Sequence, residues 1–299
     1  MEKQKSIKFI WLILVFGLLL AGATAVFWRT ALKEKAAGIF SSPDASFNSP
    51  KKDFNENFQK DEVINETAKM SRSQSPDWWV NSGGKMIIEE GVGKTIQGEI
   101  SPDSEWYKKY KSSNSRDTDG GVHPQNIFRL VTRTKWQNFI QQAHFKINAL
   151  NFTESENRNE SNGILLFNRY EDGDNLYYTG VRVDGLAVIK KKYGGKYYTM
   201  SEKEIFPGEP YDREKNPNRL PLGEWIGLKS EFQNTPDGDV EIKLFVRVGK
   251  TGNWQLAVSA VDDGRKDFGK NILSDAGYAG IRTDFMDVEF SDYKISETK

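Results

Sequence analysis

The chain has 299 residues, of which 37% are apolar and 12% aromatic, and this is enough to build a hydrophobic core. Its 42 basic and 42 acidic residues cancel, so no overall charge favours binding to nucleic acid. The chain has no cysteine and two histidines, which excludes disulfides and zinc–thiolate sites and argues against a multi-histidine metal centre.

The amino terminus carries the pattern of a membrane-directed segment. Three lysines within the first eight residues precede an apolar run from Phe9 to Trp28, which is about the 20 residues that a membrane-spanning helix needs. The small residues from Ala23 to Ala25 also fit a signal cleavage site. We therefore expect residues 1–28 to be either an uncleaved membrane anchor or a removed signal. Both place the rest of the chain outside the cytoplasm.

Residues 29–76 are polar, with many serines, asparagines and lysines, and offer little apolar surface to bury. We expect this segment to be a flexible, largely disordered linker. The folded domain is then expected to occupy residues 77–299.

From Trp78 onward, short apolar segments alternate with Gly, Asp, Asn and Pro turns, and no long helical pattern intervenes. Segments of this kind predict an all-β fold of antiparallel strands. The expected strands are 85–88, 95–100, 126–133, 139–150, 163–170, 176–183, 186–192, 225–233, 240–248, 254–262, 276–284 and 288–295. Three insertions of a length that is often functional separate them, at 101–124, 151–162 and 201–223.

Residues 163–192 read as three strands joined by two turns, the second of them an Asp-Gly hairpin signal. If Tyr170 pairs with Leu176, alternation places the aliphatic side chains on one face. The other face is then expected to carry polar side chains that reach solvent together, namely Asn168, Tyr178, Arg182 and Lys191. A register shifted by one residue would bury two unpaired cations, which costs several kcal/mol in order of magnitude.

The strand 139–150 alternates in the same way, with Gln142, His144 and Lys146 opposite its apolar residues. Arg129 and Arg133 share one face of the preceding strand. If these strands extend the same sheet, all the residues named form one basic, hydrogen-bonding surface. The ordinary solvated face of an antiparallel sheet would show a similar pattern.

Three runs resemble the concanavalin A-like lectin/glucanase jelly roll, a class that includes laminin-G-like modules: SNGILLFNRYEDGDNLYYTGVRVDGLAVIKKK, LGEWIGLKSEF and GYAGIRTDFMDVEFSDYKI. The resemblance covers residues 78–295 and implies a two-sheet antiparallel jelly-roll sandwich that holds glycans on its concave sheet. We therefore expect a membrane-tethered, extracytoplasmic carbohydrate-binding module for a polysaccharide. Its expected ligand-binding residues are Arg129, Lys146, Asn168, Arg182 and Lys191.

Two other functions fit the same pattern. Gln142-Ala143-His144 resembles the Gln-x-His strand of alginate-lyase-like jelly rolls, so a polysaccharide lyase acting on a uronate by β-elimination is an alternative. Its catalytic residues would be His144, Tyr178, Arg133 and Gln142. The Glu-x-Asp-x-Glu strand of related glucanases is not matched. A cell-envelope structural or interaction domain is the second alternative.

No cofactor is required by these patterns, and a structural calcium ion is possible. Asp292 resembles the carboxyl-terminal calcium ligand of jelly rolls of this class. The pairs Asp117 with Asp119 and Asp172 with Asp174 have oxygen-rich spacing, although Asp-rich surface turns would look the same.

Overall fold

The computed structural model describes residues 53–264 and 267–298. The predicted membrane segment, residues 1–28, and the linker up to residue 52 lie outside the described residues. Within the described ranges, no helix is long and apolar enough to cross a membrane.

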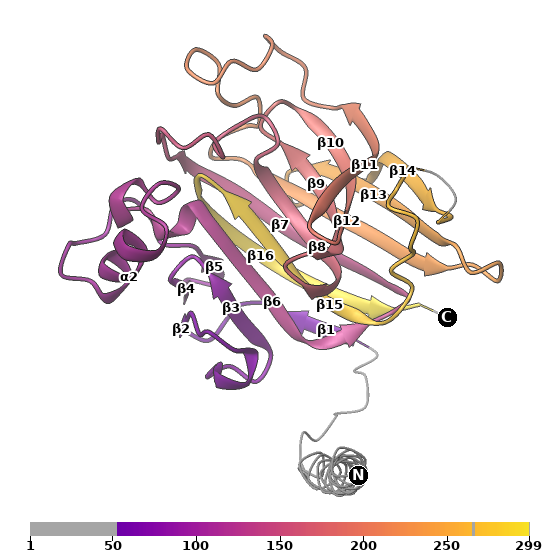
Figure 1. The fold of residues 1–299 in the computed structure, drawn as a ribbon, viewed down its shortest axis with the longest axis horizontal. Coiled ribbons are helices and arrows are strands. Elements are labelled where there is room, and N and C mark those ends of the chain that lie inside the picture. Colours follow the sequence, from indigo (N-terminus) through magenta and orange to yellow (C-terminus); the bar gives the residue numbers. More distant parts are fainter. Residues whose placement is uncertain (1–52, 265–266, 299) are drawn as a thin grey trace, which may run out of the picture. The chain divides into compact units, whose positions relative to one another are not determined.

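The described chain folds into two antiparallel sheets (Figure 1). Sheet A has nine strands, in the order β14 (Gln255–Asp262), β13 (Val240–Val248), β12 (Trp225–Asn234), β7 (Phe139–Leu150), β16 (Met286–Glu297), β5 (Val92–Lys94), β4 (Lys85–Glu89) and β2 (Glu62–Asn65), with β1 (Asp53–Glu56) also paired to β16. Sheet B has seven strands, in the order β11 (Lys196–Glu204), β10 (Leu186–Tyr193), β9 (Asn175–Arg182), β8 (Gly163–Asp172), β15 (Gly277–Asp284), β6 (Ile127–Trp136) and β3 (Trp78–Ser82). The predicted all-β, two-sheet antiparallel sandwich is confirmed.

The main hydrophobic core lies between the two sheets. It combines inward side chains of sheet A, such as Phe145 and Phe290, with inward side chains of sheet B, such as Leu166 and Ile281, and all four are fully buried. Alternate residues of each strand point to opposite faces. The residues between these core positions therefore lie on the outer face of each sheet, where a ligand can reach them.

The first insertion contains short helices that the sequence analysis did not predict. They are α2 (Glu105–Ser113) and the 3-10 turns η2 (Asp119–Gly121) and η3 (Pro124–Asn126); a third turn, η1 (Met70–Arg72), precedes β3. The Ser104 side chain caps α2 by accepting from the Trp106 amide. The buried Tyr110 hydroxyl donates to Glu66 Oε2 at 2.5 Å and accepts from the Gly83 amide at 2.7 Å. These bonds fix the helix to the β2 and β4 side of sheet A.

The predicted boundary at residue 77 falls inside the folded unit. Residues 53–56 and 62–65, which the sequence analysis assigned to the linker, form β1 and β2. Phe54 is 8% exposed, with its ring centroid 5.4 Å from that of Trp78 and 5.9 Å from that of Tyr293. This part of the linker prediction is wrong. Single apolar residues in a polar segment give no periodic signal, and Phe54 is buried because β1 pairs with β16.

Phe54→Ala tests whether β1 is part of the core. We expect it to lower the free energy of unfolding by about 3–5 kcal/mol, since it removes a buried ring from a packed aromatic cluster. Urea denaturation of the full chain measures the change. Val63→Ala in β2 is the matched control, because Val63 is 46% exposed and should change stability by less than about 0.5 kcal/mol. Equal, negligible effects would show that the segment is not packed.

Candidate functional site

The pairing of β8 with β9 decides which side chains of this region reach the surface. Phe167 lies opposite Tyr178, and residues opposite each other share a face. The predicted register placed Asn168 opposite Tyr178 instead. That prediction is wrong because the register shifts between Asn168 and Asp172, where Arg169 has a left-handed φ of 48°. A bulge of this kind carries no periodic signal in the sequence.

Asn168 and Lys191, both predicted to bind ligand, point into the interior and are fully buried. Lys191 Nζ lies 2.6 Å from Asp262 Oδ2, which also accepts from the Tyr177 hydroxyl at 2.5 Å. Asn168 Oδ1 accepts from Ser230 Oγ at 2.8 Å. Each contact links sheet B to sheet A. These two residues therefore hold the sheets together and are not available to a ligand.

Gln142, His144 and Lys146 alternate outward from β7, as predicted, but β7 belongs to sheet A. They lie on its outer face, on the opposite side of the sandwich from Tyr178. Lys146 Nζ forms an ion pair with Glu289 Oε2 at 2.6 Å. His144 Nδ1 lies 3.4 Å from Asp292 Oδ2.

His144 is held as a neutral ring. Its Nε2 atom contacts the Arg247 guanidinium, and its ring stacks on Trp254 with centroids 5.9 Å apart. Burial, followed by the positive charge of Arg247, lowers the pKa of His144 to about 4, while Asp292 opposes this shift. With Nε2 facing a guanidinium donor, the ring proton belongs on Nδ1, which faces Asp292.

The carboxylate predicted to bind calcium contacts nitrogen atoms. Asp292 Oδ2 lies 3.4 Å from His144 Nδ1 and 3.4 Å from Lys250 Nζ. Among residues 53–264 and 267–298, no group of three or more His, Asp or Glu side chains is placed to hold a metal ion. The calcium hypothesis stays a prediction.

The predicted lyase residues do not form one site. Gln142 and His144 lie on the outer face of sheet A, whereas Tyr178 lies on the outer face of sheet B. Arg133, in β6 of sheet B, donates from Nη1 to the Ser75 carbonyl at 2.6 Å. The sequence analysis assumed that β6 and β7 extend one sheet, but the chain passes from one sheet to the other between them.

The outer face of sheet B does gather three of the predicted residues, Arg129, Tyr178 and Arg182. Arg282 lies beside Arg129 on the neighbouring strand, and Lys190 lies beside Tyr178. Tyr197, from the edge strand β11, comes within 6.0 Å of the Tyr178 ring, centroid to centroid. We call this group the sheet B face; its members are Arg129, Tyr178, Arg182, Lys190, Tyr197 and Arg282.

Arg282 is the central contact of the sheet B face. Its Nε donates to both carboxylate oxygens of Asp284, at 2.8 and 3.0 Å, and its Nη1 donates to the Tyr178 hydroxyl at 3.2 Å. Burial raises the pKa of Tyr178 to about 12, although Arg282 opposes the shift. Tyr178 is therefore a neutral, fixed phenol, while Tyr197 is 53% exposed and open to a ligand.

Beneath these polar groups lies an apolar floor. A second hydrophobic cluster, separate from the core, is formed by Val131, Leu165, Phe167, Tyr170, Leu176, Tyr178 and Val188. Gly180 and Gly280 lie among these residues, and a Cβ would meet a neighbouring carbonyl oxygen at 2.3 Å and 2.1 Å respectively. Only glycine fits these two positions.

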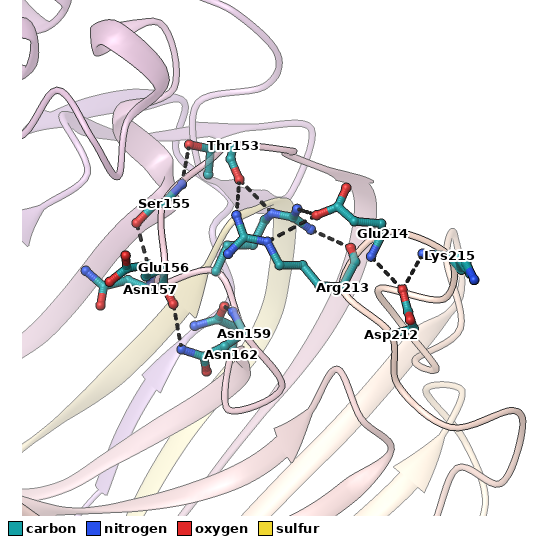
Figure 2. Close-up of polar contacts among 11 residues, drawn as sticks. Thr153, Ser155, Glu156, Asn157, Asn159, Asn162, Asp212, Arg213, Glu214 and Lys215 are labelled. Atoms are coloured by element: carbon teal, nitrogen blue, oxygen red, sulfur yellow. Dashed lines mark hydrogen bonds and ion pairs between the residues drawn. The ribbon is translucent and has the colours of Figure 1, made fainter.

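Polar contacts join the second insertion to the third (Figure 2). Arg158 joins them: its Nε donates to the Thr153 carbonyl, its Nη1 to the Arg213 carbonyl and its Nη2 to Glu214 Oε1, each at 2.9 Å. The second insertion also accepts from the face, because Arg182 Nε donates to the Glu160 carbonyl at 3.2 Å. The loops are thus attached both to each other and to the site.

Arg282 is the functional residue that the sequence analysis missed. The signal was present in the strand expected at 276–284, where Tyr278, Gly280 and Arg282 share one alternation phase. That strand lies between β6 and β8 in the sheet although it is distant from both in sequence. Without its position, Arg282 could not be grouped with Arg129 and Tyr178.

No protein-family model and no curated relative matches the chain. Among solved structures, the chain is similar to the carbohydrate binding module CBM66 from Bacillus subtilis, with 15% identity, a TM-score of 0.39 and coverage of 58% of this chain and 83% of that one. It is also similar to a beta-glucanase from Bacillus licheniformis, with 11% identity, a TM-score of 0.42 and coverage of 83% and 98%. A putative glycosyl hydrolase from Parabacteroides distasonis gives 15% identity, a TM-score of 0.39 and coverage of 74% and 88%.

The two-sheet antiparallel sandwich that the resemblance implies is present, whereas the concanavalin A-like class itself stays a prediction. With identities of 11–15% and TM-scores of 0.39–0.42, these similarities assign neither an activity nor a ligand to this chain.

The lowered pKa of His144 predicts that acid destabilises the protein. Histidine has a pKa near 6.5 in the unfolded chain and, at position 144, a pKa of about 4 in the folded protein. Between these pH values the unfolded state binds a proton that the folded state does not bind, so acid favours unfolding. Stability should therefore fall by about 3 kcal/mol between pH 6.5 and 4. Urea denaturation across this range measures it. His144→Gln should flatten the dependence, and an unchanged dependence in this variant contradicts the assignment to His144.

The buried Lys191–Asp262 ion pair predicts that substitutions at its two residues have non-additive effects on the free energy of unfolding. Asp262→Ala leaves an unpaired ammonium between the sheets and should cost about 3–5 kcal/mol of stability. The double variant Lys191→Met with Asp262→Ala should lose less than the single one, because no uncompensated charge is then buried. Denaturation of the two single variants, Asp262→Ala and Lys191→Met, and of the double variant measures the effect. A double variant that loses the sum of the two single changes contradicts this role.

Proposed function

We propose that this chain is a carbohydrate-binding module whose ligand, a polysaccharide, lies on the sheet B face. The observation that carries the proposal is the arrangement around Arg282, whose guanidinium hydrogen-bonds to the buried Tyr178 and lies beside the exposed ring of Tyr197 on one outer face. A sugar has an apolar ring face that stacks on aromatic rings and hydroxyl groups that hydrogen-bond to charged side chains.

Preorganisation supports a binding role. The Arg282 guanidinium is already oriented by Asp284, and the Tyr178 hydroxyl is oriented by Arg282. The second and third insertions are tied to each other through Arg158. Groups that are fixed before the ligand arrives lose little conformational entropy when it binds.

In this proposal the apolar segment Phe9–Trp28 holds the module in a membrane, or directs its export if it is cleaved. The module then works outside the cytoplasm. The support is the sequence pattern of lysines followed by an apolar run. The β-elimination alternative has no support in the geometry, because His144 and Tyr178 lie on opposite outer faces of the sandwich.

Binding of the full chain to a panel of immobilised polysaccharides tests the proposal. Tyr197→Ala should weaken binding about tenfold, which corresponds to about 1.4 kcal/mol, because it removes an exposed ring from the face. Tyr107→Ala, in α2 and outside the face, is the matched control and should bind as the unaltered chain does. If no polysaccharide binds, the cell-envelope interaction alternative takes the place of this function. If the two variants lose affinity equally, the location is wrong.

A further inference from the structure

We infer that the sheet B face selects a polyanionic glycan, one that carries carboxylate or sulfate groups along its length. This inference rests on the proposed function and adds the chemical class of the ligand. It comes from two cations of this face that lack a carboxylate partner, from their position and from the spacing of the strands that bear them.

The carboxylates near the sheet B face are already held by cations. Asp284 accepts from Arg282 Nε at 2.8 Å. Arg182 forms ion pairs with Asp184 and, at 3.3 Å, with Glu202. These carboxylates are therefore not available to balance the remaining cations.

Two cations of the face are left without a carboxylate partner. In the part of the chain that the structure describes, neither Arg129 nor Lys190 forms an ion pair with an acidic side chain, and the one hydrogen bond of the Lys190 ammonium is to Ser161 Oγ at 3.4 Å. Both residues are half-buried. A half-buried cation loses part of its hydration, so a ligand anion is a stronger partner here than on an open surface.

The position of Arg129 strengthens this point. It lies directly opposite Arg282 in the β6–β15 register, so two guanidinium groups occupy one face of neighbouring strands. Neighbouring strands are about 4.8 Å apart, and like charges placed opposite each other destabilise a sheet. An anion bound between the two would remove that repulsion, and guanidinium groups recognise carboxylate and sulfate oxygens through paired N–H donors.

The titration of neighbouring groups reflects the same positive potential. Burial, followed by the charge of Arg182, lowers the pKa of Lys190, while Glu202 opposes this shift. Burial alone would raise the pKa of Tyr197, yet Arg282 and Lys192 bring it below its ordinary value of 10. Lys190 and Tyr197 therefore both lose a proton more readily than they would in water. The excess charge extends over β10, β11 and β15.

The spacing of the cations indicates an extended ligand. Arg129 in β6 and Lys190 in β10 are separated by β15, β8 and β9, which is four strand spacings or about 19 Å. Between them lies the apolar floor, whose Leu165 and Phe167 side chains are buried under the polar groups of the face. A chain crossing the strands would place anionic groups at both flanks. A single sugar would not reach both cations.

The test measures affinity of the full chain for three classes of polysaccharide at several salt concentrations. The probes are a carboxylated one, polygalacturonate, a sulfated one, dextran sulfate, and a neutral one, dextran. We expect at least one anionic probe to bind about tenfold or more tightly than dextran, with an affinity that falls as salt rises. Which anionic probe binds tighter distinguishes carboxylate from sulfate as the recognised group.

Arg129→Gln should lower affinity for the anionic probe about tenfold and leave binding to dextran unchanged, whereas Arg129→Lys should recover part of the loss. Arg116→Gln is the matched control, since Arg116 is 63% exposed and lies outside the sheet B face. Dextran binding as tightly as the anionic probes overturns the inference and leaves the proposed function intact. No binding to any polysaccharide overturns both. Equal binding of polyaspartate overturns the requirement for a glycan.

Discussion

The backbone at Arg169 determines which residues of β8 and β9 meet on the outer face of sheet B. Its φ of 48° is left-handed, which costs a non-glycine residue about 1–3 kcal/mol. Its buried side chain offsets this cost, because Nε donates to the Gln137 carbonyl at 3.0 Å and Nη1 to the Leu273 carbonyl at 2.8 Å. Gly277 passes so close that a Cβ there would lie 2.4 Å from the Arg169 carbonyl carbon. This bulge brings Tyr178 outward.

Polar groups inside the sandwich reinforce the same register. Lys191 with Asp262, and Asn168 with Ser230, are cross-sheet contacts in which every residue is fully buried. A buried ion pair adds little net stability compared with apolar packing, but a displaced register would leave its charges unpaired at a cost of several kcal/mol. These contacts therefore favour one alignment of the two sheets. The positions of the side chains on the outer face of sheet B therefore follow from the alignment that these buried contacts favour.

The sequence predicted what depends on local alternation and missed what depends on long-range pairing. Along β7, the outward phase of His144 and Lys146 was correct because the strand is regular there. Asn168 was misplaced because a bulge changes the register without changing the residue pattern. Phe54 was assigned to a linker because its strand is recognisable only beside β16. Arg282 was overlooked because its strand joins the site from near the end of the chain.

Both outer faces of the sandwich carry ion pairs as well as cations without a carboxylate partner. On sheet A the pairs include Lys146–Glu289, Lys229–Glu231 and Lys250–Asp292. Among the described residues, Arg247 of the same face contacts the His144 ring and forms no ion pair with an acidic side chain. On sheet B, Arg129 and Lys190 remain unmatched among the described residues. Exposed pairs contribute little stability, yet they cancel the local potential. Because the chain as a whole has equal numbers of acidic and basic residues, the positive potential of sheet B is a local property. On sheet B the unmatched Arg129 also lies opposite Arg282, so an anionic group placed between them contacts two guanidinium groups at once.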